Sequence, residues 1–139
     1  MKQHIDAITV KTDGQNLYNF TSAIENWISA KNLKTGILNL SILHTSASLI
    51  VQENADPDVM TDMKNFFNKL VPRDGKSYIH SAEGKDDMPA HIKSALTNSH
   101  LSLSVNKGQL VLGTWQGLYL FEHRIESHTR TVNLHYLGD

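Results

Sequence analysis

Apolar residues recur along the chain at two spacings, and each change of spacing marks a change of element. Residues 5–10 are rich in β-branched side chains and precede a turn signal, Asp13-Gly14, so they predict a strand. From 17 to 30 the apolar residues return every three or four positions, which is typical of an amphipathic helix. Alternation of apolar and polar residues then predicts two strands, over 38–42 and 47–51.

A second helix is predicted to begin at Asp56-Pro57-Asp58, because an acid caps the first turn and proline suits the first helical position. Pro72 ends this helix, and a polar loop follows over 72–86. Asp87 is predicted to cap a third helix. The faces expected to be buried are Val59, Met63, Phe66, Phe67 and Leu70 in the second helix and Met88, Ile92, Ala95 and Leu96 in the third.

The last third of the chain is predicted to be β-structure. Strands are expected over 101–105, 109–113, 117–122 and 129–137, with a turn at 106–108. Strands and helices do not alternate regularly, as they would in a parallel doubly wound sheet. The pattern therefore predicts a single α+β domain over residues 1–139, with antiparallel or mixed sheets in a sandwich-like arrangement and about three helices.

Four charged or imidazole side chains stand at strand ends, on the face that otherwise points inward. Steps of two residues along the predicted strands lead to His44, Glu53, Glu122 and Arg130. A charged group on an inward face is costly unless it is paired or belongs to a site. Three interpretations stay open: strand ends that fray into solvent, a structural ion pair of Arg130 with Glu122 or Glu53, and a polar functional site.

The loop that precedes the third helix is a second candidate for chemistry. A glycine-bearing loop that opens a helix presents free N–H groups to an anion, and Lys85 would reinforce this for a phosphate. Asp87 and His91 are four residues apart and share a helix face, so they are able to bind one metal ion. The simpler alternative is that Asp87 only caps the helix. His80, together with His44 and His91, would suit zinc.

Two glycines flank a tryptophan and a glutamine in the segment 113–117, and this is the third candidate. Such glycines indicate a close approach of the backbone to another chain segment or to a ligand. Trp115 would stack on a flat heterocycle, and Gln116 would bind the edge of that ring. The alternative is a β-bulge that places Trp115 in a subunit interface.

Composition narrows the class of protein. The 139 residues carry 13 Lys+Arg and 14 Asp+Glu, so the formal charge is −1 and no basic field favours nucleic acid or anionic lipid. The absence of cysteine excludes disulfides, thiolate zinc sites and a cysteine nucleophile. No apolar run approaches the roughly 20 residues that cross a bilayer, and the first residues lack the apolar stretch of a signal peptide. We therefore expect a cytoplasmic protein without a nucleic-acid or membrane partner.

Three stretches of the chain also carry a family resemblance. They are His44-Thr45-Ser46-Ala47-Ser48-Leu49 leading to Glu53-Asn54-Ala55-Asp56-Pro57, then Glu83-Gly84-Lys85-Asp86-Asp87-Met88-Pro89-Ala90-His91-Ile92-Lys93-Ser94, and Leu112-Gly113-Thr114-Trp115-Gln116-Gly117 with Glu122-His123-Arg124. In this order, and over nearly the whole chain, the sequence resembles the YjbQ family of small α+β proteins. The resemblance implies a homotrimer.

The resemblance implies the activity of a thiamine-phosphate synthase, a secondary activity of the family. This reaction joins hydroxymethylpyrimidine diphosphate to thiazole phosphate and releases pyrophosphate, so the expected partner is a small phosphorylated heterocycle and the expected cofactor is Mg²⁺. The residues assigned are His44, His91, Glu53 and Arg130 for catalysis, Gly84, Asp86, Trp115, Gln116 and Glu122 for substrate binding, and His44, His80, Asp56, Asp87 and His91 for the metal. The alternatives are a zinc-dependent hydrolase with a three-histidine site and a metabolite-binding module without turnover.

Overall fold

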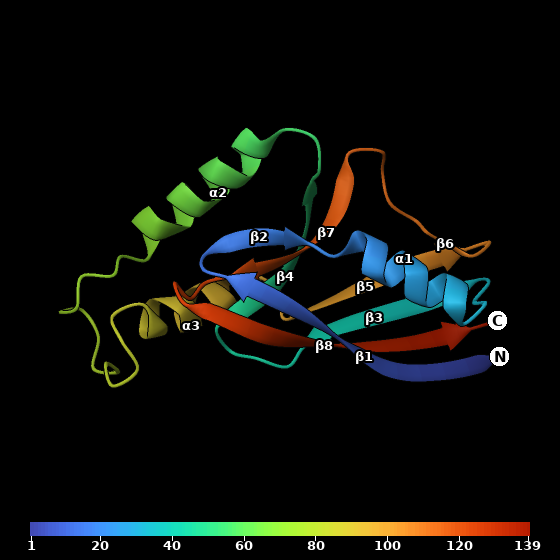
Figure 1. The fold of residues 1–139 in the computed structure, drawn as a ribbon, viewed down its shortest axis with the longest axis horizontal. Coiled ribbons are helices and arrows are strands. Elements are labelled where there is room, and N and C mark those ends of the chain that lie inside the picture. Colours follow the sequence, from blue (N-terminus) through green and yellow to red (C-terminus); the bar gives the residue numbers. More distant parts are fainter.

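The computed structural model describes all residues, 1–139, and contains eight strands and three helices (Figure 1). The strands are β1 (Lys2–Asp13), β2 (Asn16–Asn19), β3 (Gly36–Ile42), β4 (Ala47–Glu53), β5 (His100–Asn106), β6 (Gln109–Leu110), β7 (Gln116–Glu122) and β8 (Ser127–Gly138). The helices are α1 (Thr21–Ala30), α2 (Pro57–Leu70) and α3 (Asp87–Leu96). None of the three helices combines the length and the apolar character that crossing a bilayer requires.

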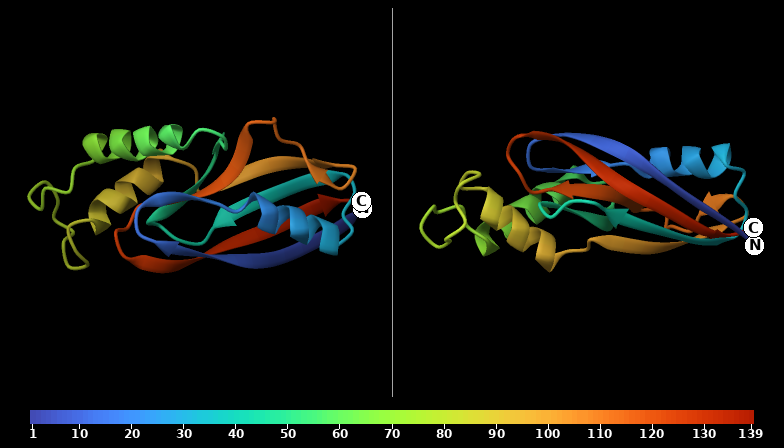
Figure 2. Two further views of the ribbon diagram at one scale, coloured as in Figure 1. Left: turned by 45° about the horizontal axis from the view of Figure 1, so that its top comes forward. Right: turned by 90° about the horizontal axis from the view of Figure 1, so that it is seen from below.

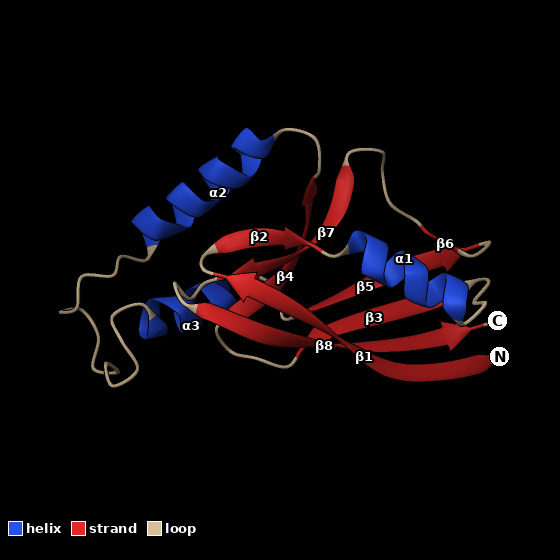
Figure 3. Ribbon diagram, in the orientation of Figure 1, coloured by secondary structure: helices blue, strands red, loops and turns tan.

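The strands form two antiparallel sheets, drawn in red in Figure 3. A five-stranded sheet has the order β1-β8-β3-β5-β6, and a three-stranded sheet has the order β2-β7-β4. All pairings within both sheets are antiparallel. The α+β class, the antiparallel sheets and the three helices predicted from the sequence are therefore confirmed.

The main hydrophobic core lies where the inward faces of the two sheets meet α1. Leu38 and Leu40 of β3 and Leu134 of β8 are fully buried, and they cluster with Ile24 and Ile28 of α1. Each such side chain contributes roughly 1.5–3 kcal/mol through burial. Figure 2 shows α1 toward the end of the molecule where both termini lie, whereas α2 and α3 lie toward the opposite end. The core therefore leaves the α2–α3 end available for polar groups.

The helix predicted over 17–30 is shorter in the structure, because its first residues form a strand. Residues 16–19 are β2, which pairs with β7 so that Leu17 lies opposite Phe121. Helix α1 begins only at Thr21. Leu17 belongs to a small second cluster with Phe121 and lies outside the main core. Its helical spacing from the apolar residues of α1 was misleading, since pairing with β7 determines the conformation here.

Helix α2 begins as predicted, but it is much less buried than its apolar spacing indicates. The side chain of Asp56 accepts a hydrogen bond from the backbone N–H of Asp58 at 2.9 Å, which confirms the predicted cap. No residue of α2 is fully buried, and Phe66 and Leu70 are more than half exposed. The helix covers only part of the three-stranded sheet (Figure 1).

The buried face of α3 is polar, and the apolar face predicted for this helix was wrong. Asp87 is the first helical residue, Asp86 occupies the capping position, and Leu96 is 57% exposed. The buried residues of the helix are Asp87, Pro89, Ala90 and Lys93. The helix turned this face inward because Asp87 has charged and imidazole partners on other segments, which apolar spacing along one helix does not reveal.

Candidate metal and ligand site

Two histidines and one aspartate converge beside the beginning of α3. His80 comes from the loop before the helix, and Asp87 and His91 lie one turn apart on it. The Nε2 atom of His80 lies 2.6 Å from Oδ2 of Asp87, and Nε2 of His91 lies 3.2 Å from the same oxygen. The three potential ligand atoms lie within 4.8 Å of one another, so these side chains are able to bind a single metal ion.

A main-chain hydrogen bond determines which nitrogen of His91 faces this cluster. The Nδ1 atom of His91 lies 2.8 Å from the carbonyl oxygen of Thr45. Because a carbonyl only accepts hydrogen bonds, Nδ1 carries the proton, and in the neutral ring Nε2 has a free lone pair. That lone pair points toward Oδ2 of Asp87, where it is repelled unless a proton or a cation lies between them. Metal-bound histidines have the same arrangement, with the distal N–H donated to a carbonyl or carboxylate.

Arg124 forms ion pairs with the two neighbouring acids Asp86 and Asp87, called here the acidic pair. Its Nη1 donates to Oδ1 of Asp87 at 2.7 Å, and its Nε donates to Oδ2 of Asp86 at 2.9 Å. Burial raises the pKa of Asp87, but the hydrogen bond from His80 and the charge of Arg124 outweigh it, so the net pKa is lowered. Asp87 is therefore ionised at neutral pH, with Oδ1 bound by Arg124 and Oδ2 facing the two imidazoles.

Beside this cluster lies a pocket of about 360 Å³. Its lining residues are His44, Thr45, His91, Ser94, Ala95, Thr97 and Ser99. The structure thus brings His44 and His91 to one pocket, although they come from distant parts of the sequence. His44 itself lies outside the candidate metal-binding group of His80, Asp87 and His91, and its Nε2 accepts a hydrogen bond from the backbone N–H of Thr131 at 2.8 Å.

Glu122 and Arg130 form a buried ion pair, which is one of the alternatives predicted for them. Arg130 Nε and Nη2 donate to the two carboxylate oxygens of Glu122 at 2.7 and 2.5 Å. Thr12 adds a hydroxyl hydrogen bond to Glu122 at 2.7 Å, and Nη2 of Arg130 also reaches Oγ of Ser46 at 3.0 Å. Both charged side chains are less than 5% exposed. They stabilise the strand ends beside the pocket, and they do not line it.

Four other predicted site residues form a second group, at the opposite end of β4. Glu53 is the last residue of β4, and it lies opposite Gln116 of β7. Asp56 is engaged in capping α2. Trp115, which is 65% exposed, lies in a tight turn in which the N–H of Gln116 donates to the carbonyl of Gly113.

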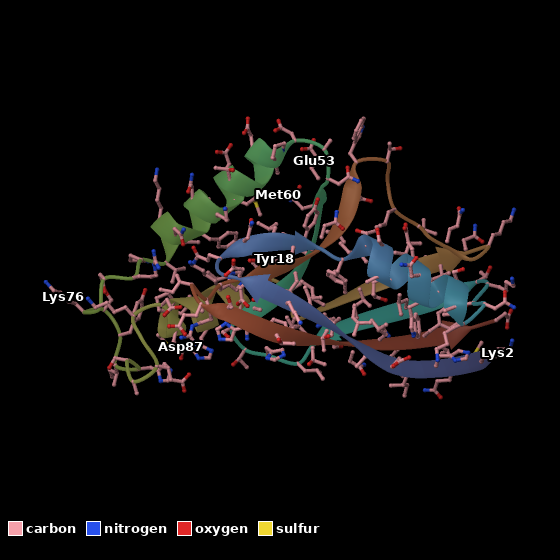
Figure 4. All side chains as sticks on the ribbon, in the orientation of Figure 1. Lys2, Tyr18, Glu53, Met60, Lys76 and Asp87 are labelled. Carbon is pink, nitrogen blue, oxygen red and sulfur yellow. The ribbon has the colours of Figure 1, made fainter.

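The two groups are separated by the length of the strand that joins them. The seven residues of β4 span about 20 Å at roughly 3.3 Å per residue. Figure 4 shows the labelled Asp87 and Glu53 in different parts of the molecule. The residues assigned to one site from the sequence therefore form two separate groups within one chain. The strand predicted over 109–113 ends at Leu110, before the turn that presents Trp115.

The glycine loop before α3 supports the acidic pair. Gly84 has a φ of +106°, a conformation that favours glycine, and a Cβ at this position would lie 3.1 Å from Oδ1 of Asp86. Asp86, expected to bind substrate, is buried and bonded to Arg124 and to the N–H of Ile125. This role of Arg124 was not predicted from the sequence, because its partners lie 37 and 38 residues away and no local spacing reveals such a contact.

The sequence also did not predict a buried lysine on α3, because a single lysine in an amphipathic helix is normally expected to be exposed to solvent. Lys93 is 1% exposed, and its Nζ donates to Oδ1 of Asn68 at 2.7 Å. Burial and the nearby charge of Arg73 lower the pKa of Lys93 to about 8. The protonated form is therefore disfavoured in the folded chain.

Lys93→Met is expected to raise the free energy of unfolding at pH 7 by up to about 3.5 kcal/mol, because the pKa falls from 10.5 to about 8 and each pKa unit corresponds to roughly 1.4 kcal/mol. The unfolded chain binds more protons between pH 8 and the ordinary value of 10.5, so the stability of the native chain rises with pH across that window. The variant loses this rise. Urea unfolding at several pH values tests the prediction, with exposed Lys69→Met as the control. Parallel pH curves for Lys93→Met and the native chain would contradict it.

The fold and the cluster define the class: a small α+β protein with two antiparallel sheets and a His-Asp-His group beside an open pocket. A sequence profile described as "UPF0047 protein YjbQ-like" matches residues 6–139, and the chain belongs to this YjbQ family.

Relatives and solved structures agree with this membership. The chain is 50% identical to a UPF0047 protein of Synechocystis sp. over 99% of its own length and 94% of the relative's. It is 45% identical to the UPF0047 protein YjbQ of Salmonella typhimurium, over 90% of this chain and 91% of that one. The crystal structure of a hypothetical protein from Aeropyrum pernix K1 is similar, with a TM-score of 0.88, 31% identity and coverage of 98% and 99%. A conserved hypothetical protein from Thermus thermophilus gives a TM-score of 0.85, 36% identity and coverage of 95% and 99%.

Proposed function

We propose that this chain is a metal-dependent enzyme that acts on a small phosphorylated heterocycle, with the activity of a thiamine-phosphate synthase. The metal ion is held by His80, Asp87 and His91. The observation that supports this most strongly is the Nδ1 hydrogen bond of His91 to Thr45, which directs Nε2 at Oδ2 of Asp87, where a metal ion would replace the proton between them. The reaction itself is taken from the family resemblance.

The donor set fits zinc better than the magnesium that the resemblance implies. Two imidazole nitrogens and one carboxylate oxygen suit Zn²⁺, whereas Mg²⁺ prefers oxygen ligands and keeps several waters. Three protein ligands beside a pocket leave a position for water or substrate. We therefore assign zinc to this cluster. Glu53 and Asp56 are not assigned to the same ion, because they lie at the far end of β4.

The proposed reaction forms a C–N bond from the thiazole nitrogen to the pyrimidine methylene and breaks the C–O bond to the diphosphate, whose oxygen takes the electron pair. A bound divalent ion would neutralise charge on that leaving group. Lys85 is suited to bind phosphate, because it lines a cavity of about 200 Å³ together with His80 and Ser81. A homotrimer, which the resemblance implies, would supply the Glu53 and Trp115 group of a neighbouring chain. The exposure of Trp115 supports an interface at that turn.

The activity is tested by supplying both substrates to metal-free protein restored with Zn²⁺, Mn²⁺ or Mg²⁺ and measuring thiamine phosphate. Product is expected with Zn²⁺, and His91→Ala is expected to lower the rate at least 100-fold, because outer-shell changes alone typically cost 10–100-fold. His135→Ala is the matched control, since His135 bonds only to Gln3 at a distant sheet position. No product above background at high protein concentration, with any of the three metals, would refute the synthase activity.

A zinc-dependent hydrolase is the second candidate, and the same donor set favours it. Two histidines and a carboxylate with an open position are typical of zinc sites that activate a water molecule. Incubation of the zinc-loaded chain with phosphate esters and carboxylic esters separates the two candidates. Ester hydrolysis without thiamine phosphate formation would support the hydrolase, and thermal stabilisation by the pyrimidine diphosphate without turnover would support a binding module.

A further inference from the structure

Each of the two imidazoles of the pocket is hydrogen-bonded to the main chain, but one ring donates this hydrogen bond and the other accepts it. His91 donates its Nδ1–H to the carbonyl of Thr45, so its Nε2 faces Oδ2 of Asp87 in the acidic cluster. His44 instead accepts the backbone N–H of Thr131 at Nε2, at 2.8 Å. A nitrogen that accepts a hydrogen bond carries no proton, so the neutral ring of His44 has its proton on Nδ1.

The surroundings of His44 keep the ring neutral. A second proton would have to enter at Nε2, directly against the N–H of Thr131. Burial lowers the pKa of His44, and Arg130 and His128 lower this pKa further. Only Glu122 opposes them, and its carboxylate is already bonded to Arg130. The hydrogen bond at Nε2 and the lowered pKa therefore both favour the neutral ring of His44.

The free Nδ1–H of His44 has no partner within the chain, and the residue lines the pocket. The other polar lining side chains are hydroxyls and His91, and no carboxylate lines the pocket. A fixed N–H donor among hydroxyls, next to a proposed metal ion, suits an anionic oxygen. It does not suit a group that must take up a proton.

We infer that His44 binds an oxyanion of the ligand through its Nδ1–H, as a neutral hydrogen-bond donor, and that it acts neither as a general base nor as a metal ligand. The oxyanion is a phosphate oxygen if the proposed function holds, and in this respect the inference rests on that proposal. The protonation state of the His44 ring does not depend on the proposed function. The assignment of His44 to catalysis and metal binding from the sequence is thereby replaced.

Long-range ¹H–¹⁵N spectra of the ¹⁵N-labelled chain test the protonation state directly. We expect a protonated Nδ1 and a bare Nε2 for His44 at pH 8, and a protonated Nδ1 for His91 whose Nε2 resonance changes when Zn²⁺ is added. Titration with inorganic phosphate should shift the Nδ1 resonance of His44 in a saturable way. A protonated Nε2 on His44, or a phosphate titration that leaves its resonances unchanged, would overturn the inference.

A matched pair of variants separates the two ring nitrogens. The side-chain amide of asparagine occupies the place of Nδ1, and that of glutamine occupies the place of Nε2. His44→Ala is expected to weaken phosphate binding roughly tenfold or more, the usual cost of one hydrogen bond to a charged group. His44→Asn should recover most of this affinity, and His44→Gln should not. Recovery by glutamine alone would overturn the inference, and failure of synthase activity with this pattern intact would refute only the proposed function.

Discussion

Glu122→Gln is expected to lower the free energy of unfolding by about 3–5 kcal/mol, the usual cost of leaving one member of a buried ion pair alone. The variant keeps the shape of the side chain but places an amide N–H₂ group against one of the two guanidinium donors of Arg130, Nε or Nη2. The guanidinium then remains buried without a counter-charge, because the side chain of Arg130 is 4% exposed. A chain of this size has a total stability of about 5–15 kcal/mol, so this loss is a large share of the total.

The double variant Glu122→Gln with Arg130→Met is the control for this prediction. It removes both charges and fills the place of the arginine with an apolar chain, so it should recover a large part of the lost stability. Urea unfolding followed by circular dichroism measures all three proteins. A loss below about 1 kcal/mol in the single variant, which is typical of an exposed pair, would show that the ion pair does not support the strand ends.

Asp87→Asn is expected to weaken zinc binding more than about 100-fold, since it removes the only carboxylate among the three proposed ligands. The amide keeps an oxygen able to accept the Nη1 hydrogen bond of Arg124, so the helix start should retain its position. Calorimetric titration of metal-free protein with Zn²⁺ measures the effect. The matched control is Asp62→Asn, which removes an exposed carboxylate from α2. Equal affinity in Asp87→Asn and the native chain would exclude this aspartate as a ligand.

The sequence predicted the inward-facing charges well, because strand parity is a local property. Steps of two residues from Val132 and Leu134 lead to Arg130, which is buried, and steps from Leu118 lead to the buried Glu122. The same reasoning does not tell which end of a sheet a residue occupies. It therefore grouped Glu53 with His44, although these residues flank opposite ends of β4.

The contacts that make the site are long-range, and this explains what the sequence did not reveal. His80 stands in an irregular loop without periodicity, and only the fold brings it to 2.6 Å from Asp87. The guanidinium of Arg124 belongs to a residue 37 positions from Asp87 in the sequence, and the carbonyl of Thr45 to one 46 positions from His91. Helix α3 buries Lys93 and exposes Leu96, because polar partners outweighed the apolar spacing. In contrast, the start of α2 depended on three neighbouring residues, and its cap was predicted correctly.

The most direct test of the account is anomalous diffraction at the zinc absorption edge from crystals of the full chain grown with Zn²⁺. The account predicts one zinc ion per chain within about 2.0–2.2 Å of Nε2 of His80, Nε2 of His91 and Oδ2 of Asp87, with His44 outside coordination distance. Zinc bound elsewhere, or no anomalous peak at this cluster under saturating zinc, would contradict it.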